Sequence, residues 1–295
     1  MPTHSPTVDV NKVIWITSLS EEEYSVTRRI HDDLLPYLLS QGIIFEELEP
    51  QSGAELLQQL DDLAVDATNG VRPIIHIDTH GNEQGLGIKA TNEMVPWEAI
   101  VDRFKKINIA TENNLCVISL ACFGFHVIEP ISITDTTPFY IVAGSQQKVY
   151  EDYIESVTVD FYKYMFDNND IVGAYNKFLA GQLRVLHCEK LVHRALAGYI
   201  RAGTMGEGAA ERIEGLLARL ARDTPPGKIF NAEEARRLLE EEIRPDQGLL
   251  ERRVQQFLIG RKPQFDIDEV IEHAKTMPDP YADRKRARPN PLDHI

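Results

Sequence analysis

Four residues of the sequence carry the side chains best suited to chemistry. His76, Asp78 and His80 are spaced two apart in "PIIHIDTHGN" (residues 73–82), and Cys122 ends an apolar segment further along. A thiol beside an imidazole is a nucleophile beside its base, and the thiolate is the form that attacks in acyl transfer. The three side chains on one strand face also form a conceivable metal triad. A Cys–His pair and a metal site are therefore both open interpretations.

The segments around these residues alternate between strand and helix. Apolar β-branched runs predict the strands, and amphipathic segments with helix-starting and helix-stopping residues predict the helices. Strands are expected at 12–19, 43–50, 72–80, 114–122 and 138–145, and helices at 20–42, 52–70, 96–110 and 150–166. Such alternation, without two-residue hairpin turns, predicts an α/β fold in which helices cover both faces of a mostly parallel sheet.

The two reactive side chains end two of these strands. Ligands of an open parallel sheet bind outside the carboxyl ends of the strands, where His80 and Cys122 are both expected. If the two strands are neighbours, the imidazole and the thiol face each other. Gly81 lets the backbone approach a substrate carbonyl and offer its N–H to an oxyanion. Gly124 allows a tight turn that leaves the Cys122 N–H free as a second donor.

The C-terminal part of the chain is expected to be helical. From about Ile171 the pattern stays helical, with breaks at 203–209 and 224–228. We place a domain boundary in this region, which gives a domain at 1–204 and an α-helical region at 205–295.

The end of the chain suits contacts with other proteins. Residues 231–260 are amphipathic and rich in charge, so we expect a regulatory protein partner to bind the C-terminal helical region. Residues 278–295 are expected to form a tail that is disordered or ordered on contact, and the basic run at 283–289 is expected to be solvated.

Composition and charge exclude several classes of protein. The 295 residues are 43% hydrophobic and 26% charged, which is typical of a globular protein. A net charge of −15 disfavours nucleic-acid binding, which needs a basic face. The sequence shows no signal-peptide pattern and no apolar run of ~20 residues that could span a membrane, so we expect a cytoplasmic protein. Three cysteines without C-x-x-C spacing argue against a disulfide framework and a structural zinc site.

The motifs around the two reactive residues resemble a known family. A strand ending in "HIDTHG" and, one crossover later, a strand ending in "SLACFG" are similar to the His-Gly and Ala-Cys-x-Gly signatures of caspase-like cysteine peptidases. The resemblance covers roughly residues 10–200 and is closest to the single-chain bacterial CHAT-type members. It implies a three-layer α/β/α caspase-hemoglobinase fold, with His80 as base, Cys122 as nucleophile and no cofactor.

The same resemblance implies where the substrate would bind. It places Ser145 and Gln146 near the pocket for the side chain that precedes the cleaved bond. Caspases carry an arginine where this chain has Phe123, so cleavage after aspartate is not supported. Metacaspases carry an aspartate two residues before the nucleophile, where this chain has a leucine. Glu151 and Asp152 could still supply negative charge for a basic side chain.

The favoured hypothesis is a cytosolic cysteine endopeptidase that cleaves protein or peptide substrates. By analogy with bacterial relatives, it would act in defence or programmed cell death. One alternative is a non-catalytic caspase-like module used for assembly. The other is a metal-dependent hydrolase built on His76, Asp78 and His80. Cys116 and the "LHCEKLVH" segment (186–193) are expected to serve packing.

Overall fold

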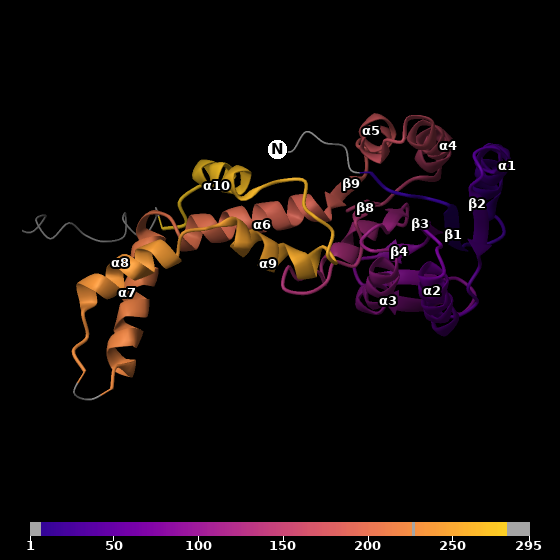
Figure 1. The fold of residues 1–295 in the computed structure, drawn as a ribbon. Coiled ribbons are helices and arrows are strands. Elements are labelled where there is room, and N and C mark those ends of the chain that lie inside the picture. Colours follow the sequence, from indigo (N-terminus) through magenta and orange to yellow (C-terminus); the bar gives the residue numbers. More distant parts are fainter. Residues whose placement is uncertain (1–6, 226–227, 282–295) are drawn as a thin grey trace, which may run out of the picture. The chain divides into compact units, whose positions relative to one another are not determined.

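The computed structural model describes residues 7–225 and 228–281 (Figure 1). The basic run at 283–289 therefore lies outside the described residues. The described chain forms two compact units. The first contains the residues up to Lys190 together with Gln255–Lys262, and the second contains the described residues of Leu191–Val254 and those from Pro263 onward. The boundary expected after residue 204 lies inside the second unit.

The first unit is built on a sheet of six strands in the order β2-β1-β3-β7-β8-β9. Five of them pair in parallel, and β9 runs antiparallel to β8. The strands are β1 (Lys12–Ser18), β2 (Ile44–Leu48), β3 (Pro73–Thr79), β7 (Cys116–Ser119), β8 (Ile141–Gly144) and β9 (Arg184–His187). The mostly parallel sheet predicted from the sequence is confirmed.

Helices cover both faces of this sheet, as the alternating pattern predicts. The helices of the first unit are α1 (Tyr24–Ser40), α2 (Gly53–Thr68), α3 (Trp97–Ala110), α4 (Glu151–Asn168) and the short α5 (Ile171–Ala174). Helices α2 and α3 pack side by side, as do α1 and α4. A 3₁₀ turn (Gly124–Ile128) and a π turn (Tyr175–Leu179) complete the helical segments.

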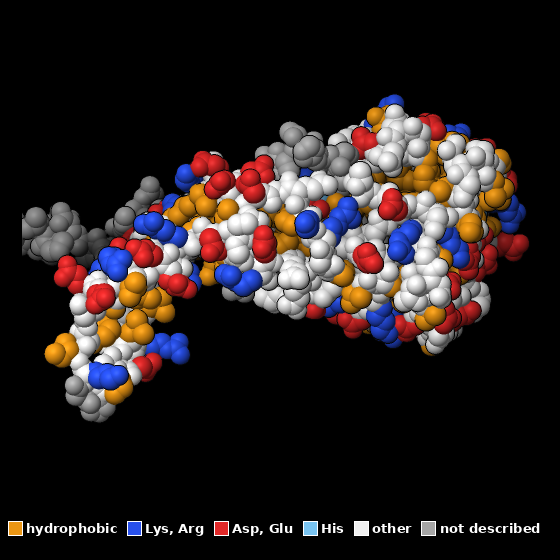
Figure 2. Space-filling model, viewed as in Figure 1, with side chains coloured by type: hydrophobic (Ala, Val, Ile, Leu, Met, Phe, Trp, Pro, Cys, Tyr) orange, Lys and Arg blue, Asp and Glu red, His pale blue; other side chains and the backbone are white. Residues whose placement is uncertain are grey.

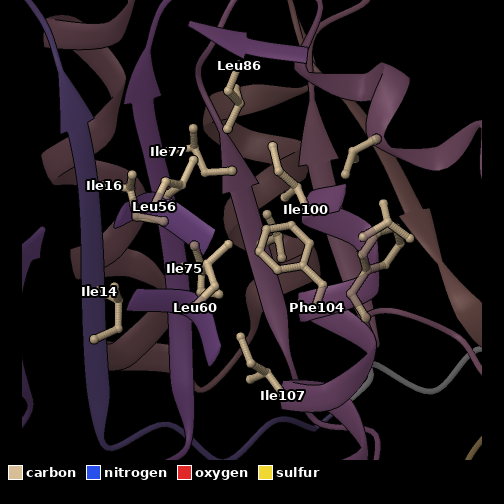
Figure 3. Packing of buried hydrophobic residues seen from close by; sticks show 14 of the residues in the cluster. Ile14, Ile16, Leu56, Leu60, Ile75, Ile77, Leu86, Ile100, Phe104 and Ile107 are labelled. Atoms are coloured by element: carbon tan, nitrogen blue, oxygen red, sulfur yellow. The ribbon is translucent and has the colours of Figure 1, made fainter. Parts of the chain in front are cut away.

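The main core lies between the sheet and the α2–α3 layer (Figure 3). Alternate side chains of the strands, such as Ile75 and Ile77 of β3, meet Leu60 of α2 and Phe104 of α3. All four side chains are fully buried. Burial of a side chain of this size stabilises the fold by about 1.5–3 kcal/mol, so this layer fixes the register in which β3 and β7 lie side by side.

The opposite face of β3 is aromatic and polar. His76 stacks on Trp15 with 3.5 Å between ring centroids, and its Nδ1 lies 2.9 Å from the Tyr162 hydroxyl on α4. Asp78 accepts a 2.5 Å hydrogen bond from the Thr27 hydroxyl on α1. These contacts attach both helices of this layer to β3.

Two local predictions are wrong. The segment after β3, where the sequence predicted no strand, forms a small antiparallel sheet of β4 (Gly81–Asn82), β5 (Gly85–Ile88) and β6 (Glu93–Pro96). Its two-residue hairpin turn depends on the Asn82 side chain, which accepts a hydrogen bond from the Gln84 N–H at 2.7 Å. These strands are too short to show an alternating pattern in the sequence.

Strand β9 lies inside the region that was expected to be entirely helical. Its four residues pair with β8, from Ile141 opposite His187 to Gly144 opposite Arg184. A strand of this length is specified by its sheet partner rather than by its own propensity.

The second unit is helical, as predicted. It contains α7 (Gly206–Asp223), α8 (Ala232–Glu242) and α10 (Ile267–Thr276), with most of α6 (Cys188–Gly203) and α9 (Gln247–Phe257). Helices α7 and α8 form a hairpin with a small apolar cluster that includes Ile213, Leu217 and Ile243. A capping box between Asp266 and Glu269 begins α10.

Residues 255–262 belong to the first unit although they follow most of the helical region in sequence. Phe257 is fully buried, and its carbonyl accepts a hydrogen bond from the Thr137 N–H at 3.1 Å. The Arg261 guanidinium lies 3.7 Å from the centroid of the Tyr140 ring and donates to the Asn113 carbonyl at 2.9 Å. A truncation after α6 would therefore remove part of the first unit.

Candidate active site

His80 lies directly after β3, where the chain leaves the main sheet. Its carbonyl accepts a 2.8 Å hydrogen bond from the Gly87 N–H, which starts the small antiparallel sheet. Its side chain is 54% exposed, and its Nε2 lies 2.9 Å from Glu23 Oε1. The imidazole is therefore held at one nitrogen while the ring remains open to solvent.

Glu23 is the site residue that the sequence prediction missed. Its carboxylate accepts hydrogen bonds from the backbone N–H and the hydroxyl of Ser20, at 2.9 and 2.6 Å. The Ser20 Oγ accepts the Glu23 N–H at 3.4 Å, which completes the reciprocal pair of a capping box. The Ser-x-x-Glu spacing before α1 is the sequence signal that could have revealed this orientation.

The charge of Glu23 is stabilised by these contacts. The hydrogen bonds from Ser20, followed by the nearby His80, lower the pKa of the Glu23 carboxyl from 4.5 to about 2. Glu23 is therefore ionised at neutral pH and presents a fixed negative charge to His80.

Cys122 lies in the turn that follows β7. The Leu120 N–H donates to the Ile77 carbonyl at 2.9 Å, which continues the ladder between β3 and β7 beyond Ser119. Phe123 adopts a left-handed backbone conformation with φ of 58°. Such a conformation is unusual for a bulky side chain and is typical of turns at functional sites. The turn leaves the Cys122 side chain partly exposed.

The loop after β8 contacts this turn at two points. The Val149 N–H lies 3.4 Å from Cys122 Sγ, and the Phe123 N–H donates to the Gln147 carbonyl at 3.1 Å. Gly124 follows, and a side chain there would overlap Ser119 Oγ, so this position requires glycine. The tight turn expected at Gly124 is present.

The structure brings the His80 and Cys122 segments together. Strands β3 and β7 are parallel neighbours, and Ile77 lies opposite Ser119. A Cβ atom added to Gly81 would lie 2.6 Å from the Cys122 carbonyl oxygen and 3.2 Å from the Ala121 Cβ. The backbones that follow the two strands are therefore in direct contact, and only glycine fits at position 81.

The Gly81 N–H points away from strand β5. Residues of an antiparallel pair alternate between positions that exchange hydrogen bonds and positions whose N–H groups face outward. His80 is hydrogen-bonded to Gly87, and Gly81 pairs with Leu86 at the next position. The Gly81 N–H is therefore directed away from the small sheet.

The four predicted substrate-binding residues fall into two groups. Ser145 and Gln146 line a cavity of about 420 Å³ next to the Cys122 turn. Ser145 is buried, and its Oγ accepts a 3.0 Å hydrogen bond from the Gln147 N–H, while Gln146 is exposed. Glu151 and Asp152 lie in the first turn of α4, are exposed, and are not among the residues that line the cavity.

The metal triad predicted as an alternative is not assembled. His76 is fully buried against Trp15 and Tyr162, Asp78 bonds to Thr27, and His80 bonds to Glu23. Burial lowers the pKa of His76 well below 6.5 and raises the pKa of Asp78. Throughout residues 7–225 and 228–281, no group of three or more His, Cys, Asp or Glu side chains is placed to hold a metal ion.

Other cysteines and histidines of the first unit are either buried or bound by a neighbouring side chain. Cys116 and Cys188 are buried, and burial raises the pKa of the Cys116 thiol to about 12. Burial also lowers the pKa of His187 to about 3. His126 is bound through Nδ1 to Glu129 at 2.6 Å. The packing roles expected for Cys116 and Cys188 agree with this burial.

Comparisons with known proteins find a likeness in structure but none in sequence. No family model and no curated protein matches the chain. Among solved structures, the chain is similar to a secreted C11 cysteine protease from Bacteroides thetaiotaomicron, "iotapain", with 10% identity and a TM-score of 0.44. The match covers 66% of this chain and 70% of that chain. This likeness is too small to transfer any residue role, so the roles proposed below depend on this chain's own contacts.

Proposed function

We propose that this protein is a cysteine endopeptidase of the caspase-like type. The observation that carries the proposal is the contact between Gly81 and the Cys122 carbonyl, at the carboxyl ends of two parallel strands. That contact sets an imidazole and a partly exposed thiol on one edge of the sheet, which is the edge where α/β folds bind ligands. The proposed acyl transfer uses only the side chains and backbone N–H groups of this chain.

In this mechanism His80 removes the proton of the Cys122 thiol, and the thiolate attacks the carbonyl carbon of the scissile peptide. The outward N–H of Gly81 and the N–H of Cys122 stabilise the oxyanion. No described residue accepts a hydrogen bond from the Cys122 N–H. His80 then protonates the leaving amine, and water hydrolyses the thioester.

Glu23 is a positioning residue in this scheme. It holds His80 Nε2, which leaves Nδ1 for the exchange of protons with Cys122. Its ionised carboxylate also stabilises the imidazolium that forms in each turnover. This role is analogous to that of the acid in a catalytic triad.

Covalent labelling tests the proposal. An acyloxymethyl ketone probe should modify Cys122 of the wild type, and the modification should be lost in Cys122→Ala and in His80→Ala. His126→Ala is the matched control, because it removes a nearby imidazole that Glu129 holds instead. Absence of labelling in the wild type, or labelling that persists in His80→Ala, would favour a non-catalytic caspase-like module.

Digestion of a peptide library shows whether the labelled site has peptidase activity. The wild type should generate new peptide termini, and Cys122→Ala should generate none. A chelator should leave this activity unchanged. Loss of activity with the chelator but not with Cys122→Ala would instead support a metal-dependent hydrolase.

We further propose that the second unit receives the protein partner that controls this activity in a cytosolic setting. Hydrophobic side chains are exposed along the α7–α8 hairpin (Figure 2), among them Leu220, Ile229 and Leu238.

No helix in the described ranges is both long and apolar enough to cross a membrane. The three cysteines are all unpaired, which suits a reducing compartment.

An internal deletion tests this second proposal better than a truncation, because residues 255–262 must stay. Replacement of residues 206–243 by a short Gly/Ser linker should leave labelling of the isolated protein unchanged. It should also abolish the change in labelling rate that a cell extract produces in the full chain. An equal response of both proteins would contradict a regulatory role for the hairpin.

A further inference from the structure

The cavity beside Cys122 has a charge opposite to that of the whole protein. Residues of the loop after β8, between 145 and 150, line one side, and residues 180–184 before and within β9 line the other. Lys148 and Arg184 are among them, and no aspartate or glutamate lines the cavity. In a chain with 46 acidic and 31 basic residues, a polar cavity whose charged lining residues are both cations favours an anionic ligand.

Neither cation has a carboxylate partner. Within the described part of the chain, no Asp or Glu lies within ion-pair distance of the Lys148 or Arg184 side chain. Both residues are exposed, so their charges are available to a ligand. An arginine can bind a carboxylate through two parallel hydrogen bonds, and a lysine adds a point charge.

The cavity also lies next to the turn that carries Cys122. Its 145–150 loop contacts the Cys122 turn at Gln147 and Val149. A peptide whose scissile carbonyl reaches Cys122 would therefore place its adjacent side chain next to this loop. The volume of about 420 Å³ is ample for a single side chain of any type, so charge rather than size would decide which residue is preferred.

We propose that this cavity selects an acidic side chain, aspartate or glutamate, immediately before the cleaved bond, with Lys148 and Arg184 as its counterions. The proposal rests on the peptidase function proposed above and names the substrate class of that site. It differs from both expectations drawn from the sequence, namely that cleavage after aspartate is not supported and that Glu151 and Asp152 could recognise a basic side chain. Both acidic residues lie outside the cavity. The positive charge is supplied by the 145–150 loop and β9, and not by the position after the nucleophile, where Phe123 stands.

Fluorogenic peptides that differ only in the residue before the cleaved bond test this proposal. The wild type should cleave Asp or Glu peptides with a kcat/KM at least tenfold higher than their Asn, Gln, Lys and Leu counterparts. The double change Lys148→Glu and Arg184→Glu should lower that value at least tenfold for acidic peptides and raise it for Lys peptides. Lys190→Glu, an exposed lysine outside the cavity, is the matched charge control and should change neither value.

Labelling of Cys122 by the small reagent iodoacetamide separates a failure of the pocket proposal from a failure of the peptidase proposal. Labelling should be equal in the wild type, in the double variant and in Lys190→Glu, since the reagent does not need the cavity. A wild type that is labelled at Cys122 in a His80-dependent manner, yet cleaves Lys or Leu peptides as well as acidic ones, overturns the acidic pocket alone. A wild type without such labelling overturns the peptidase proposal, and the pocket proposal with it.

Discussion

Strands β3 and β7 each have one reactive residue type in the middle of the strand and again just after its carboxyl end. The two positions differ in their exposure to solvent. In the middle of the sheet, His76 and Cys116 are fully buried. At the carboxyl ends, His80 is 54% exposed and Cys122 is partly exposed. The same residue types on the same pair of strands are therefore inert in the middle and accessible at the edge.

Burial accounts for this difference. Loss of water disfavours the charged form of each buried group, so the pKa of His76 falls well below 6.5 and that of Cys116 rises to about 12. A thiol that burial keeps neutral does not attack a carbonyl, and a histidine that burial keeps neutral does not take up its proton. In the proposed mechanism, position along the strand rather than residue type therefore decides which histidine and which cysteine react.

The largest effect should come from the histidine at the edge. His80→Ala should lower kcat/KM by about 10²–10⁴-fold, because it removes the proposed general base. Its free energy of unfolding should hardly change, since the side chain is half exposed. Peptide hydrolysis and urea unfolding measure the two quantities.

His76→Phe is the matched change in the middle of the sheet. It should lower the free energy of unfolding by about 1–3 kcal/mol, because it leaves the buried Tyr162 hydroxyl without its partner. Its kcat/KM should stay within a few-fold of the wild type wherever the protein is folded. A loss of activity equal to that of His80→Ala would contradict the division between the two positions.

Gly81→Ala should have the next largest effect. The new Cβ would clash with the Cys122 carbonyl at 2.6 Å, which forces the two backbones apart. We expect kcat to fall by about 10–10²-fold, since one proposed oxyanion donor is displaced together with the proposed Cys–His pair. Gly215→Ala in α7, where an added Cβ meets nothing within 4 Å, is the control.

Glu23→Gln should have a smaller effect on activity and tests the contact of Glu23 with His80. The amide keeps one acceptor but removes the negative charge, so kcat should fall about tenfold with KM nearly unchanged. Glu22→Gln, an exposed neighbour, should have no effect on either constant. An unchanged kcat in Glu23→Gln would show that its contact with His80 does not contribute to turnover.

The smallest expected effect is the loss of stability at acidic pH that arises from the buried side chain of His31. Burial lowers the pKa of His31 from 6.5 to about 4, and its ring packs edge-on against Trp15. Between these pH values His31 binds a proton in the unfolded chain but not in the folded chain. The free energy of unfolding should therefore fall as the pH drops from about 6.5 toward about 4, by at most about 1.4 kcal/mol per pH unit for this group.

His31→Phe should reduce that dependence while it preserves the aromatic packing. Urea unfolding of the wild type and the variant at about pH 7 and about pH 5 gives the comparison. The difference between the two pH values should be smaller in His31→Phe. The same difference in both proteins would show that His31 is not one of the groups responsible.

The sequence predicts the long parallel strands of the sheet better than the short strands. Long apolar runs such as 72–80 identify the parallel strands, and their ends place His80 and Cys122 on one edge. The short strands β4 to β6 and β9 depend on pairing with their neighbours, which no local pattern records.

The site shows the same limit. Gly81 and Cys122 could be placed because each follows a strong strand. Glu23 could not be placed, because its role depends on a contact with His80 across 57 residues of sequence. The charge of the cavity likewise depends on Arg184, which reaches it from a strand that the sequence did not predict.

The rate at which iodoacetamide alkylates each cysteine tests the central claim most directly. Peptide mapping by mass spectrometry at neutral pH should show Cys122 modified at least tenfold faster in the wild type than in His80→Ala. Cys116 and Cys188 should stay unmodified until the protein unfolds. Equal rates at Cys122 in the two proteins would show that the imidazole does not activate the thiol, and would contradict the account.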